Sequence, residues 1–153
     1  MLRSYRALLA GVLFAALTLG ETLSLRASEP SARGDAYRVI VNADNPVGSL
    51  DKRTLANIFL KKITQWPDGQ VIYPADLEAS QEVRKRFSHD VVGRSVDAVK
   101  SYWQQAIFSG RDVPPVEFAN SAEIIKYILA HKGAIAYISA SEPADNVKTI
   151  TVR

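Results

Sequence analysis

The stretch AIAYI, residues 134–138, is an unbroken apolar run between a glycine and a serine. A run this short, with two isoleucines and a tyrosine, predicts a strand. Because no polar residue interrupts it, the strand is expected to be covered on both faces. Strands of this kind are typical of α/β domains, in which helices pack on each side of a mainly parallel sheet.

The rest of the chain alternates between strand and helix patterns on either side of this stretch. Strands are predicted at 37–43, 70–75 and 147–152, with a short strand or loop at 116–119; helices are predicted at about 50–61, 80–92, 95–108 and 121–131. Ser49 is the expected N-cap of the first helix, and Lys61 and Lys62 fall in its last turn. Asn120 and Glu123 have the spacing of a capping box. This order predicts a three-layer α/β sandwich with a mainly parallel sheet flanked by helices.

The composition fits one globular domain. The chain has 153 residues, of which 47% are hydrophobic and 23% are charged. It contains no cysteine, which excludes disulfides and thiolate metal sites. Stability is therefore expected to come from packing.

The N-terminus has the pattern of a secretory signal peptide. Arg3 and Arg6 precede the apolar run 7–20, which is shorter than the roughly 20 residues that span a bilayer. Cleavage after Gly20 or after Ala27 would leave small residues at the cut, and an uncleaved tether is the alternative. We expect a signal peptide at 1–27, a flexible lead at 28–36, a single domain at 37–153 and a periplasmic location.

Removal of residues 1–27 makes the chain nearly neutral. Of 19 Lys and Arg, three lie in this segment, and of 16 Asp and Glu, one does, so 16 cations and 15 anions remain. A net charge of +1 with scattered charges gives no electrostatic footprint for nucleic acid. Nucleic acid is therefore excluded as a partner.

The sequence contains no constellation typical of an enzyme. No G-x-S-x-G, P-loop, G-x-G-x-x-G or H-E-x-x-H motif occurs. The two histidines, His89 and His131, are expected on helix surfaces. The acidic residues Asp76, Glu78 and Glu82 lack the spacing of a calcium loop and are interpreted as helix-start acids. We expect no enzymatic activity, no metal and no cofactor.

One stretch favours anion binding, the transition from strand to helix at 75–87. Free N–H groups at a helix N-terminus attract an anion, and ligands of open α/β sheets collect beyond the carboxyl ends of strands. Ser80, Gln81 and Arg84 are the candidate anion-binding residues. The alternative is that Ser80 only caps its own helix.

Five segments in order resemble the phosphate-type periplasmic substrate-binding proteins of ABC transporters, in particular the short PstS-like branch. They are NIFLKKITQWPDG (57–69), a strand, the Ser80, Arg84 and Phe87 pattern, YWQQAIFSGRDVPP (102–115) and KGAIAYIS (132–139). Lys61 stands where that family commonly has glycine. Of its phosphate cradle only Ser80 matches, and Asp76 and Glu78 lie in the approach.

The resemblance implies one lobe of a type II periplasmic binding protein. It implies that the protein binds phosphate or a related small oxyanion, for ABC-type uptake or sensing with a membrane permease. A ligand-free interaction module in an envelope complex is the alternative. Because such proteins close two lobes around a ligand, a homodimer or another protein would supply the second wall. Trp66 is expected to lock the first helix onto the sheet.

Overall fold

The computed structural model describes residues 36–153, so the predicted signal peptide at 1–27 and most of the lead at 28–36 lie outside the described residues. The strands are β1 (Tyr37–Asn42), β2 (Ser49–Leu50), β3 (Tyr73–Leu77), β4 (Val116–Phe118), β5 (Ala134–Ser139) and β6 (Val147–Val152). The helices are α1 (Lys52–Phe59), α2 (Glu82–Phe87), the π-helical segment η1 (Ser88–Val92), α3 (Val96–Phe108) and α4 (Ser121–Ala130).

The strands form one six-stranded mixed sheet in the order β2-β6-β1-β5-β3-β4. The pairs β2 with β6, β3 with β4 and β3 with β5 are parallel. The first strand, β1, runs antiparallel to both of its neighbours, β5 and β6. The predicted α/β sheet flanked by helices is thus confirmed, and its antiparallel component is confined to the pairs that β1 makes.

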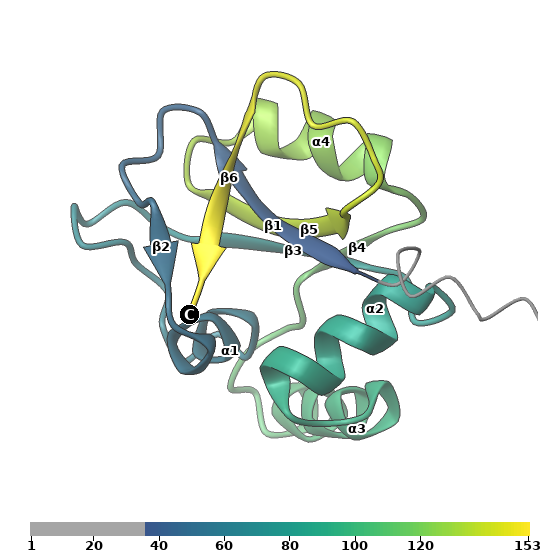
Figure 1. The fold of residues 1–153 in the computed structure, drawn as a ribbon. Helices are drawn as coiled ribbons and strands as arrows, with labels where there is room; N and C mark the ends of the chain where they lie inside the picture. Colours follow the sequence, from purple (N-terminus) through teal and green to yellow (C-terminus); the bar gives the residue numbers. More distant parts are fainter. Residues whose placement is uncertain (1–35) are drawn as a thin grey trace, which may run out of the picture.

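Helices cover the sheet on both faces (Figure 1). Helix α4 packs on one face, against β5, β3 and β1, and α2 packs against the same three strands from the opposite face. Helix α1 lies beside η1, and α3 stands outermost in the layer of α1 and α2. This is the expected three-layer arrangement.

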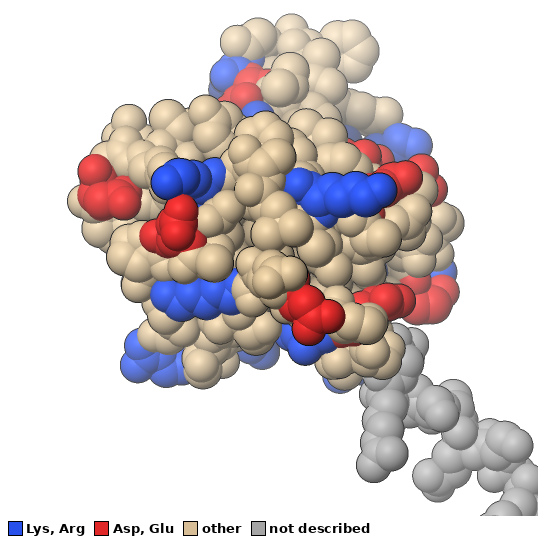
Figure 2. All heavy atoms as spheres, turned by 90° about the horizontal axis from the view of Figure 1, so that it is seen from above, with Lys and Arg blue, Asp and Glu red and all other residues tan. Residues whose placement is uncertain are grey.

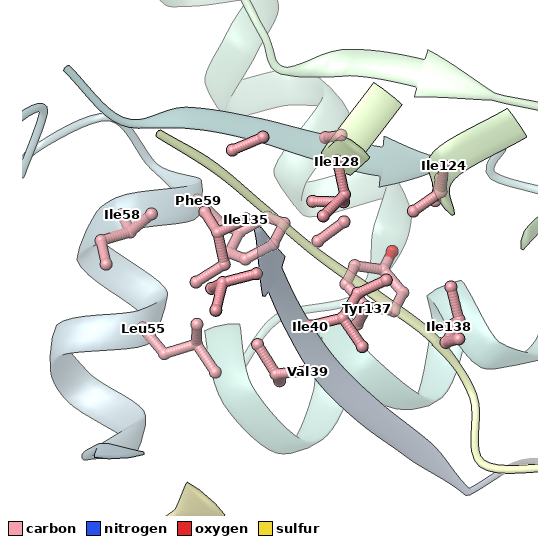
Figure 3. Packing of buried hydrophobic residues seen from close by; sticks show 14 of the residues in the cluster. Val39, Ile40, Leu55, Ile58, Phe59, Ile124, Ile128, Ile135, Tyr137 and Ile138 are labelled. Atoms are coloured by element: carbon pink, nitrogen blue, oxygen red, sulfur yellow. The ribbon is translucent and has the colours of Figure 1, made fainter. Parts of the chain in front are cut away.

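Strand β5 lies at the centre of the core, as its sequence predicts. All five residues of 134–138 are completely buried. Figure 3 shows Leu55 and Phe59 of α1 pointing toward β1 and β5, where Phe59 lies 5.7 Å from the ring of Tyr137. The ring of Phe87 in α2 stacks on Tyr137 at 3.8 Å between centroids, so one aromatic group joins both helices to β5.

The strand predicted at 70–75 begins three residues later. The segment 64–72 forms a turned loop in which Trp66 N–H donates to the Gln70 carbonyl (2.8 Å) and Ile72 N–H donates to the Thr64 carbonyl (2.9 Å). Trp66 is buried, and its indole Nε1 donates to the Gly133 carbonyl at 3.0 Å. The tryptophan therefore attaches the loop after α1 to the start of β5, which agrees with the predicted anchoring role.

The start and end of α1 differ from the prediction. Ser49 does not cap the helix, because Ser49 and Leu50 pair with Thr151 and Val152 of β6. Asp51 is the N-cap instead, with Oδ1 accepting from Thr54 N–H at 2.9 Å. A strand pairing between distant segments thus moved the helix start by two residues.

The two lysines follow α1 rather than lie in its last turn. Lys61 N–H donates to the Ile58 carbonyl and Lys62 N–H to the Asn57 carbonyl, which is the Schellman pattern. Lys61 takes the left-handed position of that motif, with φ of 51°. Glycine is favoured at such a position, which agrees with the glycine that the family resemblance leads us to expect there. The side chain of Lys61 forms an ion pair with Asp112 at 3.2 Å.

The capping carboxylate gives a test of the α1 boundary. Hydrogen bonds from Thr54 hold the pKa of Asp51 below its ordinary value, so its charge stabilises the fold above that value and the gain is lost as the pH falls through the lowered pKa. We expect Asp51→Ala to lower the thermal unfolding midpoint at pH 7, whereas Asp51→Asn, which can also cap, should lower it less. Calorimetric melting of the three proteins from pH 7 to pH 2.5 should show the wild type losing its advantage over Asp51→Asn at the acid end. Equal midpoints for Asp51→Ala and wild type at pH 7 would contradict this assignment.

Candidate functional site

The start of α2 lies directly beyond the carboxyl end of β3, where the sequence predicts an anion site. The helical segment predicted at 80–92 is α2 followed without a break by η1. Gln81 is its N-cap residue, and its side chain makes no capping hydrogen bond. In the other α-helices of residues 36–153 an Asp, Ser or Asn side chain caps the first turn. The first amides of α2 are therefore left without a partner from the N-cap side chain.

Two of the three predicted residues lie at this helix start. Ser80 is exposed, and it does not cap α2, since the N-cap is the next residue. Gln81 is half-buried: its side-chain Nε2 donates to the Ala119 carbonyl at 2.8 Å, and its backbone N–H donates to the Glu78 carbonyl at 3.0 Å. Gln81 thus ties the helix start to the end of β4, and Ser80 projects at the surface.

The third predicted residue, Arg84, points into the protein. It is 4% exposed, and its Nη1 forms an ion pair with Oδ2 of Asp76 in β3. The Tyr137 hydroxyl donates to the other carboxylate oxygen of Asp76, which also accepts from Leu77 N–H at 3.1 Å. The structure therefore brings Ser80 and Gln81 together at the surface and separates Arg84 from them.

Burial keeps the Tyr137 hydroxyl of this network protonated. Desolvation raises the pKa of the Tyr137 hydroxyl well above its usual value, although the Arg84 charge acts in the opposite direction. The hydroxyl consequently stays protonated and donates to Asp76. A carboxylate with a cation, a hydroxyl and an amide as partners is compensated, so Asp76 does not act as an exposed repulsive charge beside Ser80.

The three acidic residues that were predicted at the start of this helix, Asp76, Glu78 and Glu82, lie in three different environments. Glu82 lies in the first turn of α2 as expected, and its Oε1 forms an ion pair with Lys85 at 2.5 Å. Glu78 is exposed in the loop that precedes the helix. For Asp76 the prediction is wrong, because this residue belongs to β3 and is the buried partner of Arg84. Sequence reasoning missed this pairing and the contribution of Tyr137.

Both histidines are exposed, as predicted. His89 lies beside Asp90, with Nδ1 3.0 Å from the carboxylate, and His131 Nδ1 lies 2.9 Å from the Tyr127 carbonyl. Within residues 36–153 no three His, Asp or Glu side chains gather as potential metal ligands. No helix in that range is long and apolar enough to cross a membrane.

Surface charge is mixed, in agreement with the near-neutral composition. Figure 2, which views the molecule from above relative to Figure 1, shows Lys and Arg side chains interspersed with Asp and Glu side chains. That face carries no extended area of one sign.

Comparison with known proteins defines the class of this fold. The model of the PBP superfamily domain matches residues 31–152, and the chain therefore belongs to the periplasmic binding protein superfamily. This confirms the family resemblance drawn from the sequence. No curated protein sequence matches the chain significantly.

Solved structures place the fold with phosphate-type binding proteins. A protein of Clostridium perfringens, described as a phosphate ABC transporter substrate-binding protein with bound phosphate, has a TM-score of 0.61 and 24% identity. A phosphate transport receptor of Vibrio cholerae has a TM-score of 0.61 and 22% identity, and PstS of Borrelia burgdorferi has 0.60 and 12%. The matches cover 77 to 78% of this chain but only 45 to 47% of those chains. This chain therefore has the fold of one lobe of a type II binding protein and spans less than half the length of these relatives.

Proposed function

We propose that the protein is an exported, single-lobe binding module that recognises phosphate or a related small oxyanion at the start of α2. The observation that carries the proposal is the uncapped first turn of α2, located beyond the carboxyl end of β3 in a chain of the binding-protein superfamily. Amides at a helix N-terminus carry partial positive charge and donate hydrogen bonds, both of which favour an anion. The Ser80 hydroxyl adds a donor beside them.

Gln81 and Arg84 act indirectly in this proposal. Gln81 fixes the helix start through its hydrogen bond to the Ala119 carbonyl. Arg84 lies behind the first turn, where its charge is compensated by Asp76. The anion is therefore bound mainly by backbone amides and the serine, and the affinity of the lone lobe is expected to be low because the site is open to water.

The second wall of the site comes from another molecule in this proposal. The solved relatives are about twice as long as the part of this chain that matches them. A second copy of the chain, or a permease or other envelope protein, would cover the anion on its open side. The predicted signal peptide and the class of protein both support a periplasmic location.

The test removes one amide without disturbing the helix. Glu82 occupies the first helical position of α2, where proline is tolerated, and Gln81 already has the extended backbone that a residue before proline requires (φ −71°, ψ 130°). Phosphate titration by calorimetry should show weaker binding by Glu82→Pro than by Glu82→Gln, which loses the same charge but keeps the amide. Glu82→Gln itself should bind phosphate more tightly than wild type, since a carboxylate near the anion is removed.

A second candidate function is a ligand-free interaction module in an envelope complex. It is favoured by one observation, the neutralisation of Arg84 by a carboxylate of the same chain. Calorimetric titration of the wild type with small oxyanions distinguishes the two candidate functions. If phosphate, sulfate and molybdate all fail to bind the wild type, the oxyanion proposal is wrong and the interaction module remains.

A further inference from the structure

A groove of about 270 Å³ runs between α3 and the segment that leads into β4, on the helix layer that contains α2 and α3. One wall belongs to α3, and the other to β4 and the loop 109–115 that connects the two elements in the chain. The side chains that matter for recognition are Lys100, Trp103, Gln104, Ile107, Pro114 and Glu117. A groove of this size fits a metabolite rather than a larger, drug-sized ligand.

The apolar part of the groove is formed by α3. Trp103 is 5% exposed and belongs to a small cluster with Val99 and Ala106 that is separate from the main core. Ile107, one turn further along, is 51% exposed although it lies against this wall. Pro114 closes the opposite side. The groove therefore offers an aromatic and aliphatic surface that the described chain leaves partly uncovered.

Two opposite charges line the same groove from its two walls. Lys100 belongs to α3 and Glu117 to β4, and both are exposed. Neither forms an ion pair within residues 36–153, so their charged groups lie more than 4.0 Å apart. The third charged residue of the lining, Arg84, is already compensated by Asp76. One cation and one anion are therefore left available to a ligand.

We propose that this groove binds an α-amino acid with an apolar side chain in its zwitterionic form. Lys100 pairs with the carboxylate of the amino acid and Glu117 with its ammonium group, while the side chain packs on Trp103 and Ile107. The Gln104 amide lies beside Lys100 and supplies a further donor or acceptor. The groove adjoins the start of α2, because Ala79 and Arg84 also line it, but the contacts proposed for the amino acid do not involve Ser80 or the first amides of α2.

Other ligand classes fit the groove less well. A phosphate ion would meet the Glu117 carboxylate and gain nothing from the apolar wall. A purely apolar molecule would leave both charges unused, and a simple carboxylate would leave Glu117 without a partner. A zwitterion with an apolar side chain matches all three features at once.

The proposal is tested by titrating amino acids into the protein, with leucine and phenylalanine as the probes. Trp103 forms the wall, so its fluorescence should change on binding, and NMR chemical shifts of α3 and β4 should follow the same titration. Glycine lacks the apolar side chain, leucinamide lacks the carboxylate and N-acetyl-leucine lacks the ammonium group. Each of these is expected to bind at least about five-fold more weakly than leucine, as the loss of one partly exposed contact predicts.

Variants of the two charged residues give the matching test. Lys100→Gln and Glu117→Gln should each weaken leucine binding about five- to ten-fold. Lys126→Gln on α4 and Glu142→Gln in the loop before β6, both exposed and outside the groove, should leave it unchanged. The proposal is overturned if leucine does not bind, if glycine binds as well as leucine, or if the groove and control variants behave alike.

Discussion

Replacing Arg84 by methionine is expected to lower the free energy of unfolding by about 3 to 5 kcal/mol at pH 7, the cost of leaving one partner of a buried ion pair alone. In the native protein Asp76 and Arg84 are both about 95% buried, and their charges compensate each other. Methionine fills much of the volume of the arginine but provides no charge, so the Asp76 carboxylate would stay in the interior without its cation. The Tyr137 hydroxyl and Leu77 N–H would not offset that loss. Urea unfolding followed by circular dichroism measures the change.

The double variant Asp76→Asn with Arg84→Met separates a lost charge partner from a packing defect. Because both charges are then absent, it should recover a large part of the stability lost in Arg84→Met. Lys85→Met is the matched surface control, because Lys85 pairs with Glu82 in solvent, and should stay within about 0.5 kcal/mol of wild type. A double variant that is no more stable than Arg84→Met would contradict the assignment of the pair.

Replacing Gly133 by alanine is expected to destabilise the protein by about 3 kcal/mol, the upper part of the range for overpacking. A β-carbon at this position would lie 2.0 Å from the carbonyl oxygen of Val71. The obstacle is backbone, so the loop 64–72 would have to move away from β5. That movement would strain two hydrogen bonds to the Gly133 carbonyl, one from Trp66 Nε1 at 3.0 Å and one from Tyr73 N–H at 3.1 Å.

Gly48→Ala is the control for this substitution. A β-carbon at Gly48 would meet nothing within 4 Å, and the backbone there is not left-handed. Its effect should therefore stay within about 0.5 kcal/mol, or be slightly stabilising. Urea unfolding should place the two variants far apart, and the fluorescence of buried Trp66 should change in Gly133→Ala. If the two glycine variants have similar free energies of unfolding, the prediction is wrong, and the Val71 backbone moves away from the added β-carbon with little loss of stability.

The elements that the sequence predicts best are those with a strong local pattern. Strand β6 begins and ends as predicted, and β5 differs by one residue, because continuous or alternating apolar residues leave little choice of conformation. The capping of α4 by Asn120 is also confirmed, with Oδ1 accepting from Glu123 N–H at 3.0 Å. Local chemistry is sufficient in these cases.

The errors arise where distant segments decide the outcome. Ser49 has the chemistry of an N-cap, but its pairing with Thr151 keeps it extended. Asp76 and Arg84 each have a plausible surface role when they are considered alone. Their burial depends on Tyr137, which is 61 residues from Asp76, and no local pattern reveals that hydrogen bond. Whether Ser80, Gln81 and Arg84 contribute to anion binding stays a prediction for the titrations proposed above.

The position of β1 has a consequence for how the chain reaches its native state. Among the strands of residues 36–153, β1 is the first to be synthesised, yet its two neighbours, β5 and β6, are the last two. The central part of the sheet therefore cannot be completed until β6 has been synthesised, and contacts of such long sequence separation form slowly. A nascent chain that has not yet made β5 and β6 therefore holds β1 without either of its partners.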